Sequence, residues 1–210
     1  LFYKDYPRLR LDVTMPEIHR DEIVMIGSYY AVTPQLRDKV KELLDKAREK
    51  GAIIYYDVNF RSTHKNEAIK LLPVILENFE YADIIRGSVE DFENMFGLTD
   101  ADKVYKSKIE FYCPHFICTH GGKGIRLYTK NIKKHYEADP LQTVSTVGAG
   151  DNFNAGVVFG LLKYRIRRDD LDELSEDDWD HVIRCGKDFS ADVCMSLNNS
   201  ISKEFAAGYK

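Results

Sequence analysis

The chain has 210 residues, of which 44% are hydrophobic and 30% are charged, and its formal net charge at pH 7 is −4. This length allows one domain with a substantial core, and the composition is typical of a soluble globular protein. The balanced charge predicts binding neither to nucleic acid nor to a membrane surface, and no apolar run is long enough to span a bilayer. The opening LFYKDYPRLR is too charged for a signal peptide, so we expect a cytoplasmic protein.

The cysteine pattern indicates neither a disulfide scaffold nor a metal centre. The cysteines are Cys113, Cys118, Cys185 and Cys194, and none of them forms a CxxC pair. In a chain this large and this poor in cysteine, we expect reduced and buried thiols.

In the first half of the chain, apolar strands alternate with amphipathic helices. The hydrophobic pattern predicts strands over 22–30, 52–61 and 82–88. It predicts helices over 34–50, 66–79 and 89–96, of which the first is opened by Pro34 and closed by Gly51. The helix over 66–79 is expected to turn Ile69, Leu72, Ile75 and Leu76 inward.

The second half continues with a helix over 101–111, a strand and glycine-rich turn over 115–124, and paired strands over 125–129 and 132–138. Helices over 151–164 and 179–198 follow, separated by a charged linker. This alternation predicts an α/β fold with a mostly parallel sheet and right-handed crossovers. Polar motifs at Gly27–Ser28, 57–61, Arg86–Ser88 and Thr119–Gly121 follow successive strands, so we expect them to line one ligand-binding edge of the sheet.

The stretch TVGAGDNFNAG combines a turn with the start of a helix. Gly148, Ala149 and Gly150 leave the backbone accessible, and the unpaired N–H groups and dipole of a helix start suit an anion. Asp151 would repel a resting phosphate, but it could accept the proton of a hydroxyl that attacks phosphorus. The alternative is a plain helix cap, because Asp and Gly are common in caps and tight turns.

VSTVGAGDNFNAG resembles the pattern D-T-x-G-A-G-D-x-F-x-A-G of the ribokinase-like, or PfkB-type, carbohydrate kinases. The resemblance implies a three-layer α/β/α fold, with Asp151 as catalytic base and Gly148, Ala149 and Gly150 in an anion hole for the transferred phosphoryl group. Ser145 departs from the pattern, since the family usually has Asp there beside a monovalent-cation site. The need for a monovalent cation therefore stays open.

DVNFR places Asp57, Asn59 and Arg61 at alternating positions, which share a face if the segment is a strand. D-x-N-x-R resembles the fructokinase and 2-keto-3-deoxygluconate kinase branches, where Asn and Arg lie near the triphosphate and the sugar. The alternative is a polar strand exit with a solvated arginine. CTHGGKG resembles the turn that packs against the nucleotide, which implies nucleotide contacts at Thr119, Gly121 and Gly124, although a simple hairpin turn gives the same pattern.

RGSVEDFENMFG occupies the place of a family segment that acts on Mg²⁺-bound phosphates through water. The resemblance places Ser88 at the nucleotide and Asp91 at the metal, while a helix cap formed by the two residues is an equal alternative. It also places Ala191, Cys194 and Asn198 of the last helix near the adenine, against the simpler interpretation of a packing helix.

The resemblance covers the carboxyl-terminal two thirds of a typical family member, as one domain over 1–210. It implies that residues 1–12 end a lid region whose other parts precede Leu1, with Tyr3, Lys4 and Gly27 contacting substrate. The sequence therefore predicts an ATP- and Mg²⁺-dependent sugar kinase, with a homodimer compatible by resemblance. The alternatives are a non-catalytic nucleotide- or sugar-binding regulator on the same fold and a nucleoside kinase.

Overall fold

A computed structural model describes residues 14–209, which form one six-stranded sheet with the strands in sequential order, β1-β2-β3-β4-β5-β6. The strands are β1 (Ile23–Gly27), β2 (Ile53–Asp57), β3 (Ile84–Ser88), β4 (His115–Thr119), β5 (Ile125–Tyr128) and β6 (Lys133–Tyr136). Strands β1 to β4 pair in parallel, whereas β5 and β6 add to β4 as antiparallel strands. The predicted mostly parallel sheet is therefore confirmed.

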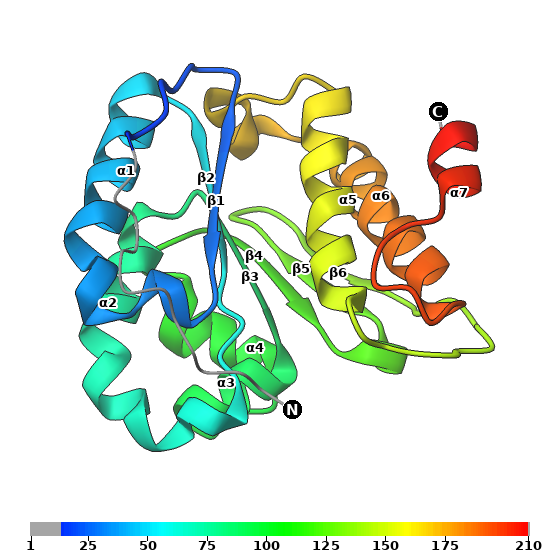
Figure 1. Ribbon diagram of the computed structural model, residues 1–210, viewed down its shortest axis with the longest axis horizontal. Helices are drawn as coiled ribbons and strands as arrows, with labels where there is room; N and C mark the ends of the chain where they lie inside the picture. Colours follow the sequence, from blue (N-terminus) through cyan, green and yellow to red (C-terminus); the bar gives the residue numbers. More distant parts are fainter. Residues whose placement is uncertain (1–13, 210) are drawn as a thin grey trace.

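Helices cover both faces of the sheet (Figure 1). They are α1 (Arg37–Lys50), α2 (Ala68–Tyr81), α3 (Val89–Phe96), α4 (Ala101–Val104), α5 (Ala149–Lys163), α6 (Glu176–Cys194) and α7 (Lys203–Gly208). Short 3-10 turns lie at Tyr29–Ala31, Pro34–Leu36, Ser62–Glu67, Gly121–Lys123 and Arg168–Glu173, and a π turn at Tyr105–Ile109. Figure 1 shows α1 to α4 on one face and α5 and α6 on the other, which is the three-layer α/β/α fold predicted.

Two hydrophobic cores result from the alternation of side chains along the strands. In β2, which is buried throughout, Tyr56 belongs to the core under α1 and α2, while Tyr55 belongs to the core under α5 and α6. Continuous burial of this kind is the usual consequence of covering a parallel sheet on both faces. All of the cysteines are free; Cys113, Cys118 and Cys185 are buried as predicted, whereas Cys194 is only partly buried. Among residues 14–209, no helix is both long and apolar enough to cross a membrane.

Several predicted boundaries and one predicted helix face were wrong. In α2, Ile69 is 90% exposed, and the buried face is formed by Ala68, Leu71, Ile75, Asn78 and Phe79. Ile75 is buried and Leu76 packs against the core as predicted, but Ile69 lies outside the buried face, to which Ala68 and Asn78 belong instead. The predicted helix over 101–111 is a short α-helix followed by a π turn, and α6 ends at Cys194 instead of residue 198.

Helices α5 and α6 approach each other very closely through glycine. A Cβ atom on Gly156 of α5 would lie 2.3 Å from the carbonyl oxygen of Cys185 in α6. On the opposite helix, a Cβ atom on Gly186 would lie 2.7 Å from the ring of Phe153. Side chains larger than hydrogen would separate the helices, so these glycines fix the position of α5, whose first turn carries the GAGD residues.

Candidate active site

The carboxyl ends of β1 to β4 meet at one edge of the sheet, and α5 begins beside that edge (Figure 1). All the polar strand-end motifs predicted from the sequence lie at or directly after the carboxyl ends of these strands. Gly148 is the N-cap of α5 and has φ 82°, and a Cβ atom there would lie 2.8 Å from the carbonyl oxygen of Asn199. Gly148 is thus required both by the left-handed turn and by the close approach of the carboxyl-terminal segment.

The first turn of α5 presents free backbone donors. The N–H of Ala149 donates to the Thr146 carbonyl at 3.2 Å, and that of Asn152 donates to the Gly148 carbonyl at 2.9 Å. Within residues 14–209, the N–H groups of Gly150 and Asp151 have no hydrogen-bond partner. The Asp151 side chain is exposed beside them. Free donors at the positive end of a helix can bind an anion, and the neighbouring carboxylate can accept a proton.

A buried polar network lies on the sheet beneath this turn. The Arg86 guanidinium donates to Asp57 Oδ1 at 2.9 Å and to Thr119 Oγ1 at 2.8 Å. Asn154 of α5 donates to the other oxygen of Asp57 at 2.9 Å and accepts from the Tyr55 hydroxyl at 3.0 Å. Burial raises the pKa of the Asp57 carboxyl above its ordinary value, against the opposing effect of the Arg86 charge. The network joins β2, β3 and β4 to α5.

The sequence predicted Arg86 only as part of a polar motif at the ligand-binding edge, without a specific role, and did not single out Asn154. Two signals were available: an arginine inside the apolar strand ADIIRGS, and a polar side chain one turn after Asp151 on the buried face of α5. Neither signal identifies the partner, because the contact joins strands and a helix that lie far apart along the chain.

Asn59 and Arg61 do not share a strand face with Asp57, so that premise was wrong. Strand β2 ends at Asp57, and Asn59 has φ 39°, which turns the chain out of the extended conformation. Arg61 is exposed, and its guanidinium forms no hydrogen bond or ion pair with another residue of the described range. Arg86 is the arginine that contacts the GAGD turn in the structure.

Ser88 and Asp91 form a complete capping box at the start of α3. Asp91 Oδ2 accepts from the backbone N–H and the hydroxyl of Ser88, each at 2.7 Å, and the Ser88 hydroxyl accepts from the Asp91 N–H at 3.2 Å. This confirms the capping alternative. No group of three or more His, Cys, Asp or Glu residues within 14–209 is arranged to hold a metal ion.

The other predicted strand-end residues fit close backbone contacts. A Cβ atom on Gly27 would lie 2.6 Å from the Asp57 carbonyl oxygen, and one on Gly124, at φ 92°, would lie 2.1 Å from that of Tyr136. Gly121 has φ 50° in the turn that joins β4 to β5, so the hairpin interpretation is confirmed. Tyr3 and Lys4 lie outside the described residues.

An apolar surface adjoins the GAGD turn. Backbone N–H groups of Val144 and Ser145 donate to the carbonyl of Cys194 at 2.8 and 3.3 Å, which holds the segment before the turn against the end of α6. Four hydrophobic side chains are exposed along these two segments: Val144, Val147, Met195 and Leu197.

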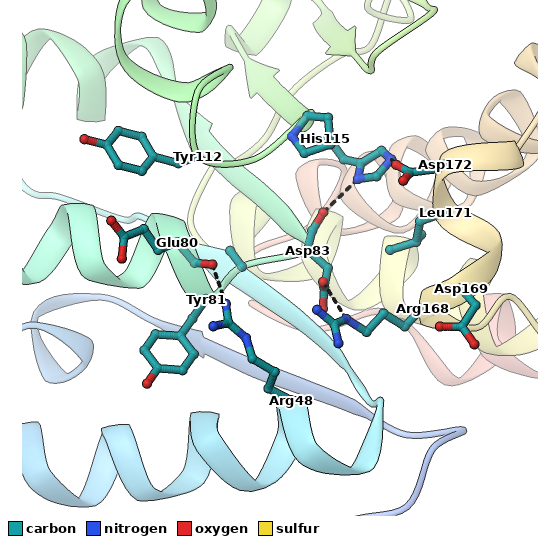
Figure 2. A pocket seen from close by; sticks show the side chains of 12 residues that line it. Arg48, Glu80, Tyr81, Asp83, Tyr112, His115, Arg168, Asp169, Leu171 and Asp172 are labelled. Atoms are coloured by element: carbon teal, nitrogen blue, oxygen red, sulfur yellow. Dashed lines mark hydrogen bonds and ion pairs between the residues drawn. The ribbon is translucent and has the colours of Figure 1, made fainter.

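A cavity of about 340 Å³ lies at the opposite edge of the sheet, next to the amino ends of β3 and β4. Figure 2 shows Arg168, Asp83, His115 and Asp172 turned toward one another: Arg168 Nε donates to Asp83 Oδ1 at 2.8 Å, and His115 lies between the Asp83 carbonyl and Asp172. None of the predicted site residues lines this cavity. The free donors and exposed carboxylate at the carboxyl edge therefore make that edge the better candidate site.

Comparisons with known proteins identify a family and agree with the fold. The family profile described as pfkB family carbohydrate kinase matches residues 8–202. A probable fructokinase-4 of Arabidopsis thaliana is 30% identical over 179 residues, which cover 80% of this chain and 51% of the relative. A 5-dehydro-2-deoxygluconokinase of Geobacillus thermodenitrificans is 27% identical over 160 residues, covering 70% of this chain and 46% of the relative.

Solved structures show the same fold. A fructokinase from Vibrio cholerae O395 with bound fructose, ADP and calcium superposes with a TM-score of 0.78 at 18% identity, covering 93% of this chain and 63% of that one. An aminoimidazole riboside kinase from Salmonella enterica gives a TM-score of 0.76 at 21% identity, covering 91% and 64%. The chain spans about half the length of the curated relatives it matches. Because the family profile matches almost the whole chain, the protein belongs to the pfkB family of carbohydrate kinases.

Proposed function

We propose that the chain carries the phosphotransfer half of an ATP-dependent sugar kinase. The observation that supports this most directly is the pairing of unoccupied Gly150 and Asp151 N–H donors with the exposed Asp151 carboxylate at the start of α5. A binding site for resting phosphate gains nothing from a carboxylate in that position. A transfer site does, because the attacking hydroxyl must lose a proton.

In this mechanism, Asp151 accepts the proton of a sugar hydroxyl as its oxygen attacks the γ-phosphorus in line. The GAGD amides stabilise the charge that develops on the phosphoryl oxygens, since donors fixed at a helix start need no reorientation during the reaction. Arg61, exposed near the end of β2, supplies positive charge from outside the turn. When bound, Mg²⁺ neutralises phosphate charge, and Asp91 contributes at most through water because Ser88 occupies one of its oxygens.

The nucleotide lies between the β4–β5 turn and the end of α6. Thr119, Gly121 and Gly124 offer mainly backbone contacts in that turn, and Asn59 and Ser88 lie at neighbouring strand ends. The exposed apolar side chains of Val144, Val147, Met195 and Leu197 suit the face of an adenine ring. Gly27 at the end of β1 lies on the substrate side, where Tyr3 and Lys4 are also expected to contribute.

Relatives named as fructokinase and 5-dehydro-2-deoxygluconokinase favour a sugar or sugar-acid hydroxyl as acceptor. A nucleoside acceptor is the second candidate, because an aminoimidazole riboside kinase of Salmonella typhimurium is 24% identical over 183 residues. A panel of fructose, 2-keto-3-deoxygluconate, 5-dehydro-2-deoxygluconate, ribose and adenosine separates these candidates by ADP release. Release with adenosine alone would favour the nucleoside kinase, and release with none of the acceptors would contradict phosphotransfer by the 210-residue chain.

Asp151→Asn tests the proposed base directly. We expect its kcat to fall by about 10² to 10⁴-fold, the range of general-base catalysis, with ATP affinity nearly unchanged. Asp38→Asn is the matched control, since Asp38 is also an exposed aspartate in the first turn of a helix, α1, where it serves only as a helix-terminal charge. Turnover of Asp151→Asn equal to that of Asp38→Asn would contradict the assignment.

A further inference from the structure

Three side chains form a row on one face of the sheet, under the start of α5. Strand alternation places Asp57, Arg86 and Thr119 on the same side as Tyr55, Ile84 and Ile117, whose side chains belong to the core under α5 and α6. Arg86 is in the middle of this row and bonds to both of its neighbours. The row therefore spans the ends of the three strands that face the GAGD turn.

The Arg86 guanidinium also lies close to the first turn of α5. A Cβ atom on Gly150 would lie 3.3 Å and 3.4 Å from its two terminal nitrogens, so the guanidinium fills the space beneath the backbone of Gly150. Its central carbon lies 5.7 Å from the centroid of the Phe153 ring. One side chain from β3 thus supports the first turn of α5 from below, within a residue of the free N–H donors.

Stability alone does not explain a buried arginine at this position. Its side chain is 8% exposed and that of Asp57 is 5% exposed, and Nε of Arg86 is buried without a partner. A buried donor without a partner costs free energy, and replacing a buried ion pair by apolar groups is often neutral or stabilising. The planar Arg86 guanidinium does, however, form two directed hydrogen bonds, to Asp57 and to Thr119.

We propose that Arg86 is a positioning residue for the phosphoryl-binding turn. Held by Asp57 and Thr119, it fixes the height and orientation of the Gly150 and Asp151 N–H groups over the carboxyl edge of the sheet. It also places a positive charge below the site where the transferred phosphoryl group develops negative charge. The consequence for turnover rests on the proposed function, whereas the effect on the turn itself does not.

Arg168 provides a matched control at the opposite edge of the sheet. It forms an ion pair with Asp83 at 2.8 Å, close to the 2.9 Å of the Arg86–Asp57 pair, and its side chain is 31% exposed. Arg168→Met therefore removes an arginine–aspartate pair from the same sheet without touching the turn. Arg86→Met removes the proposed support and keeps a side chain of similar length.

Hydrogen–deuterium exchange of a peptide covering 146–154 measures the turn, on the 210-residue chain and its folded variants. Arg86→Met is expected to raise exchange in this peptide by about tenfold, which corresponds to about 1.4 kcal/mol of lost local stability, while Arg168→Met leaves it unchanged. Arg86→Lys keeps the charge but reaches only one of the two partners, so we expect it to restore part of the protection. If Arg86→Met does not fold, Arg86→Lys carries the same comparison.

Kinetics then distinguish positioning from general stability. We expect Arg86→Met to lower kcat about 10²-fold, the effect of an ångström-scale misplacement, with little change in KM for the sugar. Equal exchange in the turn for the Arg86 and Arg168 variants, or raised exchange with unchanged kcat, would overturn the proposal. If the wild-type chain transfers phosphate to no acceptor, the proposed function fails, and the exchange comparison alone decides the role of Arg86.

Discussion

Both edges of the sheet carry charged and hydrogen-bonding groups, but in the described part of the chain these groups are paired at one edge and unpaired at the start of α5 on the other. The amino edge has a cavity of about 340 Å³ in which Arg168 pairs with Asp83 and His115 pairs with Asp172. The carboxyl edge has an open turn whose donors are free and whose Asp151 carboxylate is exposed. If the presence of a cavity were the only criterion, the amino edge would be the candidate functional site. The free N–H donors and the exposed Asp151 carboxylate favour the carboxyl edge instead.

A large loss of stability is expected from a mutation of the glycine before α5. Gly148→Ala should lower the free energy of unfolding by about 1–3 kcal/mol and lower kcat, because φ 82° and the Asn199 carbonyl at 2.8 Å both exclude a Cβ atom. Gly122→Ala is the control, since nothing lies within 4 Å of its Cβ position. Urea denaturation and ADP release measure both quantities. Equal stability of the two variants would contradict the strain argument.

A second comparison concerns two buried polar side chains, one beneath the proposed site and one elsewhere. Asn154 and Asn78 are both fully buried; Asn154 bonds to Asp57 and Tyr55, and Asn78 donates to the Ala31 carbonyl and accepts from Arg37. Replacing either by alanine leaves partners unsatisfied and should lower the free energy of unfolding by about 1–3 kcal/mol.

Only Asn154→Ala should also lower kcat, because only Asn154 links α5 to Asp57 beneath the turn. Denaturation by urea and steady-state kinetics on both variants check this difference. A similar loss of kcat in Asn78→Ala would mean that turnover follows global stability and not the organisation of the carboxyl edge.

The smallest effect is a pH dependence at the start of α6, where Ser175 and Asp178 form a second capping box. Hydrogen bonds from the Ser175 side chain and backbone lower the pKa of Asp178 below its ordinary 3.8. A depressed pKa contributes stability above the unfolded value, and this contribution is lost as pH falls through the folded value. Stability measured between pH 5 and pH 2.5 should therefore fall slightly less steeply in Asp178→Asn than in wild type. Identical pH profiles would show that the cap adds nothing.

The fold could be predicted because local patterns and one long motif pointed to the same architecture. Alternation of strands and helices indicated the parallel sheet, and the GAGD residues marked the start of α5 within two residues. The predictions failed where a contact between distant parts of the chain determines the local structure. The exposed face of α2 at Ile69 and the turn at Asn59 depend on neighbouring elements, and the contact of Arg86 with Gly150 depends on how α5 lies over the sheet. The roles assigned to Asp151, Arg61, Asp91 and the nucleotide contacts stay predictions.

The sequential strand order also constrains how the chain can fold. Each strand from β2 to β6 pairs with the strand that precedes it in the sequence, so the sheet can grow from one edge by closing short crossovers. The bonds of Arg86 with Asp57 and Thr119, by contrast, require β2, β3 and β4 together, and its contact with Gly150 also requires α5. During synthesis, the sheet can therefore form before the turn is organised. The proposed site then forms late in folding, because it requires all of these elements.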